Sequence, residues 1–205
     1  MVVYFFRTAW NFGVSTLERS VHRNKLSLNR LALADTHVWR GRAGLLDVGL
    51  NSHMNEAAVV SNIELARLNG VIQLILSQKW TVVVASNMVQ YSGDKMHALQ
   101  PYEVHSRIAY WDDSWQYFTH RFVCPDTGKL LVEAVSRTMI KDRHRQTVPF
   151  ERVLELLSVE RERPTEMPRV IQGFLAWDAA TKINMERVQQ PQPEYVRKEL
   201  VTTTA

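Results

Sequence analysis

The chain has 205 residues, of which 45% are hydrophobic and 22% charged, so it can bury a substantial core. Its formal net charge is +4, but the basic residues are scattered, and the densest basic run, KDRHR at 141–145, contains no aromatic residue. We therefore expect a globular protein, interpret that run as a solvated surface, and find no direct nucleic-acid-binding motif.

The first 34 residues are basic and poor in acids. Glu18 is their one acid, against the basic residues Arg7, Arg19, Arg23, Lys25 and Arg30. This balance is typical of a mitochondrial-type presequence or a basic amphipathic helix, and equally of a helix packed on the domain or on a partner. We predict that residues 1–34 are an extension, which favours a mitochondrial over a cytoplasmic location. No apolar run approaches the ~18 to 20 residues of a transmembrane span.

A short strand is predicted at 36–42, THVWRGR. From Asn55 to about Gln78, apolar residues recur at helical spacing and nearly encircle the axis, which indicates a long helix covered on most sides. Its polar remainder is too small to form an ordinary water-facing surface and consists of Ser61, Asn62, Glu64, Arg67 and Asn69.

Four segments with the residue types of strands follow the helix. They lie at 80–91, 102–111, 115–124 and 129–141 and are rich in valine and aromatic residues, with alternating polarity. The connections between the last three are short, which predicts an antiparallel meander. One long helix and one curved antiparallel sheet make an α+β fold.

The C-terminal part carries weaker patterns. Residues 149–157 are predicted to form a short amphipathic helix, a charged linker with prolines follows, and 169–183 are predicted to form a second helix. The tail from Gln189 has no periodicity, and we expect it to lack fixed structure unless a partner orders it. The predicted organisation is a main domain at 35–157 and a helical and disordered extension at 158–205.

Cysteine and histidine give no separate site. Cys124 is the single cysteine, which excludes an intramolecular disulfide, and we interpret it as a small buried residue near a strand end. His37, His105 and His120 are expected on the polar faces of strands. The sequence contains no nucleophile elbow, phosphate-binding loop, dinucleotide-binding motif or zinc-ligand spacing, so no cofactor or metal is predicted.

The run DVGLNSHMNEAAVV at 47–60 places Asn51, His53 and Asn55 at alternate positions before the long helix. Together with QPYEVHSRIAYWDDSWQYFTHRF at 100–122, it resembles the hot-dog thioesterases, within them the family related to 4-hydroxybenzoyl-CoA thioesterase and to mammalian thioesterase superfamily member six. The resemblance covers about residues 36–157. It implies a hot-dog fold, in which a curved antiparallel sheet wraps a long central helix, and a dimer with the active site between protomers.

The chain departs from this family at two motif positions. The family pattern runs Asp, any residue, Asp, two variable positions, a small residue, His, Met, Asn, Asn, and here it begins at Asp47. The second Asp, which supplies the catalytic carboxylate in well-studied relatives, falls on Gly49, and the last Asn falls on Glu56. An acid at the latter position favours the helix dipole.

Thioester hydrolysis needs a polarised carbonyl group and an activated water molecule. The N–H groups at the start of the long helix can supply the first, and a carboxylate or histidine the second. As the resemblance implies, His53 can act as the base while Asn51 orients substrate or water, as in related plant acyl carrier protein thioesterases. The candidate catalytic residues are Asp47, Asn51, His53, Asn55 and Glu64.

Several of these candidates also have structural interpretations. The carboxylate of Asp47 can cap a nearby N–H, and His53 and Asn55 can hold the loop-to-helix turn by hydrogen bonds. The side chain of Glu64 can pair with Arg67 three residues further along the helix.

Two functions of different classes follow. The first is an acyl-CoA or acyl carrier protein thioesterase that acts as a homodimer on acyl thioester substrates. The second is a hot-dog domain that has lost catalysis and serves as a structural subunit of a larger complex, in mitochondria if the presequence interpretation is right. Gly49, Glu56 and the two terminal extensions favour the second function.

Overall fold

A computed structural model describes residues 36–49, 53–94 and 96–189. The chain divides into two compact units, Met1–Glu166 and Met167–Ala205, and each is described by itself. The predicted extension at 1–34 and the tail from 190 lie outside the described residues, so their interpretation stays a prediction. None of the described helices is long and apolar enough to cross a membrane.

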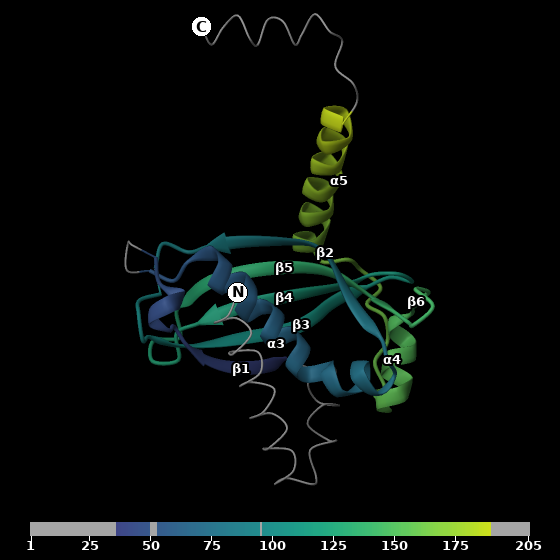
Figure 1. Cartoon of the computed structure of the whole chain (residues 1–205), viewed down its shortest axis with the longest axis horizontal. Helices are drawn as coiled ribbons and strands as arrows, with labels where there is room; N and C mark the ends of the chain where they lie inside the picture. Colours follow the sequence, from purple (N-terminus) through teal and green to yellow (C-terminus); the bar gives the residue numbers. More distant parts are fainter. Residues whose placement is uncertain (1–35, 50–52, 95, 190–205) are drawn as a thin grey trace, which may run out of the picture. The chain divides into compact units, whose positions relative to one another are not determined.

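The first unit contains one curved antiparallel sheet crossed by a long helix (Figure 1). The strands pair in the order β1-β3-β4-β5-β2, and β6 adds to β5. Strands β3, β4 and β5 form the predicted meander, and the α+β hot-dog architecture is confirmed. The strand bounds are β1 (His37–Arg42), β2 (Thr81–Tyr91), β3 (Pro101–Trp111), β4 (Gln116–Val123), β5 (Leu130–Lys141) and β6 (Thr147–Val148).

Helix α3 (Glu56–Ser77) supplies one side of the main core and follows the short 3-10 helix η1 (Leu45–Asp47). Its apolar face packs on three strands, through Ala58, Val59, Ile63 and Ala66 against Tyr102, Val104, Phe122, Val132 and Ala134. The sheet does not cover the helix on every side, since Val60 is 38% exposed and Leu76 55% exposed. Two residues of the predicted polar remainder, Asn62 and Arg67, are instead buried.

The WDD turn between β3 and β4 is tied to helix α4 (Phe150–Leu157) and to the linker after it. The ring of Trp111 packs edge-on against Phe150, and its Nε1–H donates to Glu151 at 2.9 Å. Arg163 then bridges Asp113 at 2.7 Å and Glu151 at 2.8 Å. This part of the sequence resemblance therefore closes one end of the sheet and belongs to the core around α4.

The second unit contains helix α5 (Arg169–Gln189), which continues beyond the predicted end at 183. The added turns include Met185, Glu186 and Arg187, all good helix formers, which explains the greater length. The rings of Phe174 and Trp177 stack with centroids 6.2 Å apart.

A row of polar side chains lies within the core of the first unit, on the middle strands. Nδ1 of His120 is 2.8 Å from Oγ of Ser106, and its Nε2 is 3.1 Å from Oγ of Ser136. All three residues are buried, and the imidazole stacks on Phe118. The expectation that His120 lies on a polar face was therefore wrong, because β4 is buried along most of its length. Burial, aided by the charge of Arg67, lowers the pKa of His120 to about 3.

We expect acid to destabilise the fold through His120. Its pKa in the folded chain, about 3, lies below the ordinary 6.5, so between these values the unfolded chain binds one more proton. The free energy of unfolding should then fall by about 1.4 kcal/mol for each pH unit below 6.5, or about 2 kcal/mol by pH 5. Urea unfolding of the wild type and of His120→Asn between pH 5 and pH 6.5 measures this change in the free energy of unfolding.

The exposed His144 supplies the matched control. His144→Asn should keep the wild-type slope of stability against pH, whereas His120→Asn should make the slope smaller and leave the part that comes from His37, whose pKa burial also lowers. The same slope in all three proteins would contradict this origin of the acid sensitivity.

Candidate functional site

The start of α3 is fixed by backbone hydrogen bonds that close the preceding loop and join it to the loop after β2. This anchoring matters because the loop carries the family motif at the wall of a pocket. The bonds run from Asn55 N–H to the Asp47 carbonyl (2.8 Å), from Gly49 N–H to the His53 carbonyl (2.9 Å), and from Met54 N–H to the Met96 carbonyl (2.8 Å).

Asn55 caps helix α3. Its Oδ1 accepts the N–H of Ala58 at 2.8 Å, and its carbonyl accepts the N–H of Val59 at 3.1 Å. No described residue accepts the N–H of Glu56 or Ala57. Within the described residues, these two N–H groups at the positive end of the helix dipole are therefore candidates to stabilise a carbonyl oxygen that gains negative charge.

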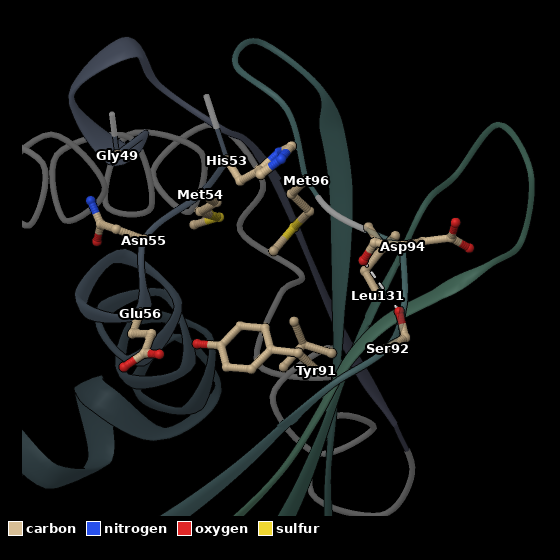
Figure 2. Close-up of a pocket in the computed structure, with 11 residues that line it drawn as sticks. Gly49, His53, Met54, Asn55, Glu56, Tyr91, Ser92, Asp94, Met96 and Leu131 are labelled. Atoms are coloured by element: carbon tan, nitrogen blue, oxygen red, sulfur yellow. Dashed lines mark hydrogen bonds between the residues drawn. The ribbon is translucent and has the colours of Figure 1, made fainter. Parts of the chain in front are cut away.

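A pocket of about 730 Å³ opens at this helix start (Figure 2). Its walls come from the motif loop, the first turn of α3, the end of β2 with the following loop, and β5. The lining residues are Gly49, His53, Met54, Asn55, Glu56, Tyr91, Ser92, Asp94, Met96, Leu131 and Val132. Their mixture of apolar side chains and a few polar groups suits a ligand with an apolar part and a polar reacting part.

Two acidic side chains line the pocket in different ways. The carboxylate of Glu56 faces the phenol of Tyr91, which crosses the pocket from the end of β2 (Figure 2). Burial, and then the charge of Glu56, raises the pKa of Tyr91 above its ordinary value. Asp94 is directed away from Tyr91 in the same view, and its carboxylate pairs with Lys129 at 3.2 Å.

His53 lies at the pocket wall beside a second histidine. Its ring meets that of His97 edge-on, with centroids 4.9 Å apart and planes at 64°. In the described parts of the chain, no group of three or more His, Cys, Asp or Glu side chains is placed to hold a metal ion. Asn51, the predicted companion of His53, lies outside the described residues.

The structure separates the remaining candidates from the pocket. Asp47 is buried, and its Oδ2 accepts the N–H of Gly44 at 2.8 Å, so it caps η1. Glu64 is half-buried in α3, and neither it nor Asp47 lines the pocket. Of the predicted site residues that the structure describes, it therefore brings His53 and Asn55 to the pocket and leaves Asp47 and Glu64 elsewhere.

The wall opposite the motif was missed from the sequence. Tyr91 is the last residue of β2, a strand whose pattern gives no sign of a ligand site, and Ser92, Asp94 and Met96 follow it. They reach the pocket because β2 pairs with β5 in the register Tyr91 to Val132. Glu56 was considered only as an acid that favours the helix dipole, since the sequence alone gave it no partner.

Comparison with known proteins agrees with this architecture. The profile of the thioesterase-like superfamily matches residues 43–175, more than half of the chain. The chain belongs to that superfamily. The match begins before the motif loop and runs through the sheet and α4, so the described pocket lies within it.

Solved hot-dog structures share the fold at low sequence identity. The probable thioesterase YbaW from Escherichia coli has a TM-score of 0.53 and 13% identity, covering 60% of this chain and 96% of its own. A 1,4-dihydroxy-2-naphthoyl-CoA thioesterase from Synechocystis has a TM-score of 0.53 and 12% identity, and the match covers 63% of this chain and 99% of that protein. The protein SAV2348 from Staphylococcus aureus, solved in complex with CoA, has a TM-score of 0.54 and 14% identity, and the match covers 66% of this chain and 90% of that protein. These similarities establish the fold.

We expect Asn55→Ala to lower the free energy of unfolding by about 1 kcal/mol, the usual contribution of an N-cap side chain. Asn55→Ser should retain most of the stability, because a serine hydroxyl can accept the same N–H of Ala58. Urea unfolding of the three proteins measures both changes. Equal destabilisation by alanine and serine would contradict the capping role.

Proposed function

We propose that this protein binds acyl thioesters of coenzyme A or acyl carrier protein in the pocket at the start of α3 and hydrolyses them. The observation that carries this proposal is the helix start at Glu56, which lines a pocket of about 730 Å³ and whose N–H, like that of the next residue Ala57, has no acceptor among the described residues. Membership of the thioesterase-like superfamily supports the reaction class. The structure of SAV2348 with CoA supports the choice of carrier.

In this mechanism the thioester carbonyl oxygen accepts hydrogen bonds from the backbone N–H groups of Glu56 and Ala57. They stabilise the negative charge that develops on this oxygen when water attacks the carbonyl carbon. The tetrahedral intermediate then expels the thiolate, which takes up a proton, so that the products are a carboxylic acid and a thiol. His53, which lines the pocket and packs edge-on against His97, is assigned in this mechanism to positioning the reacting group.

Purified protein should hydrolyse at least one acyl-CoA in a panel of short, medium and long chains, followed by release of free thiol. His53→Ala should lower kcat/KM by about ten- to a hundredfold, the scale expected when a positioning group is lost. His144→Ala, at an exposed site, is the matched control and should leave turnover unchanged. Hydrolysis no faster than the uncatalysed background throughout the panel would contradict the proposal.

The same proposal includes a homodimer formed along β2. This strand is an edge of the sheet, and none of its 11 residues is buried, although its sequence TVVVASNMVQY is largely apolar. An exposed apolar edge of this length favours pairing with a second copy.

Light scattering of the purified protein should give a mass of about 47 kDa, twice the 23.7 kDa of one chain. Val83→Lys on β2 should shift the mass toward the monomer. Val38→Lys on β1 is the matched control, because both valines are 39% exposed on edge strands. A monomeric wild type, or equal effects of the two variants, would contradict pairing through β2.

One observation favours the second function, a subunit without catalysis. Gly49 lines the pocket at the motif position where relatives carry the catalytic carboxylate. A structural role predicts that the native protein is recovered from cell extract in a large complex and that the purified chain does not hydrolyse thioesters. Recovery of a free pair of chains with turnover would contradict it.

A further inference from the structure

The pocket has a carboxylate that can replace the one missing at Gly49. Glu56 and Gly49 both line it, so a side chain from the first turn of α3 reaches the space that the motif loop borders. Glu56 is exposed and lines the pocket, and Figure 2 shows its carboxylate beside the phenol oxygen of Tyr91.

The other carboxylates near this region are otherwise engaged or lie elsewhere. Asp94 pairs with Lys129 and points away from Tyr91. Asp47 is buried, accepts a hydrogen bond from the N–H of Gly44 and does not line the pocket. Among the described lining residues, Glu56 is therefore the acid that faces Tyr91.

Tyr91 faces Glu56 from the opposite wall. Since burial and the charge of Glu56 both raise the pKa of the phenol, Tyr91 keeps its proton and acts as a hydrogen-bond donor. A neutral donor opposite a carboxylate fixes the orientation of that carboxylate, or of a water molecule between the two groups. The two side chains come from α3 and β2, so the packed sheet and helix set their separation.

We propose that Glu56 is the general base of the thioester hydrolysis and that Tyr91 is the residue that positions it. This assignment rests on the proposed function. The Glu56 carboxylate takes one proton from water while the water oxygen bonds to the carbonyl carbon. The C–S bond then breaks, and the protonated Glu56 returns the proton to the leaving thiolate, so the enzyme is regenerated without any other reactant.

The test compares Glu56→Gln, Glu56→Asp and Tyr91→Phe with the wild type on the acyl-CoA that the wild type hydrolyses best. Glu56→Gln should lower kcat by about 10²- to 10⁴-fold, the usual contribution of a general base, and change KM by less than about threefold. Glu56→Asp should recover part of the rate. Tyr91→Phe should lower kcat by about tenfold at nearly constant KM. Loss of folded protein would not produce this pattern in the variant's kcat and KM together with unchanged binding of substrate analogue.

Glu155→Gln is the matched control, because Glu155 is an exposed acid on α4 paired with Arg152. It should leave kcat and KM unchanged. Calorimetric titration with a thioether analogue, which cannot be hydrolysed, should give Kd values for Glu56→Gln and Tyr91→Phe within about threefold of the wild type. Circular dichroism should show that all variants are folded.

The outcomes separate the two proposals. Wild-type turnover that Glu56→Gln leaves intact overturns the role of Glu56 and keeps the proposed function. Weaker binding of the analogue in proportion to the lost kcat/KM assigns Glu56 to binding and overturns its role as base. A wild type that hydrolyses no acyl-CoA overturns both.

Discussion

The site depends on one requirement of α3: a helix packed on a sheet begins with N–H groups that have no partner within the helix. Asn55 satisfies one of them through its side chain, and the backbone hydrogen bonds of the preceding loop hold this start in place. Glu56, the first residue of the helix, lines the pocket. The polar motif therefore holds the helix start in place, and in the proposed function the same geometry binds the thioester carbonyl.

The core of the first unit combines two apolar clusters with a polar row. On β3, Val104 belongs to the cluster under α3 and Ile108 to the cluster under α4, while Ser106 lies between them in sequence. His120 remains neutral, so one ring nitrogen can accept a hydrogen bond and the other can donate one to the two serines. Such a row fixes the arrangement of the middle strands, because a shift in register would leave buried polar groups without partners.

In the proposed mechanism, a carboxylate on the first turn of α3 takes the place of the motif-loop carboxylate that the family resemblance implies at Gly49. A carboxylate on the motif loop and one on the first turn of the helix can serve the same volume, because these segments are adjacent walls. Replacement of the loop carboxylate by Gly49 is for this reason insufficient, by itself, to assign the protein to a structural role.

The sequence by itself determined most of the described secondary structure. Periodicity predicted α3, strands β1 to β5 and α4 to within one or two residues, since burial on one face imposes a local spacing of apolar residues, whereas the two-residue strand β6 was not predicted. The residue types that can cap α3 were also recognisable, because a cap joins residues three apart. The family motif predicted the hot-dog fold and included His53 and Asn55 among the predicted site residues.

Only the tertiary structure decided which side chains share the pocket. Asp47 looked like a site residue and caps η1, whereas Tyr91, from a distant strand, faces Glu56. His120 was predicted on a polar face, but it is buried. Strand β4 lies between β3 and β5 in the sheet, and the alternation of residue types along β4 did not reveal this central position. Strand register and helix packing bring residues far apart in the chain together, and a local pattern contains no information about such contacts.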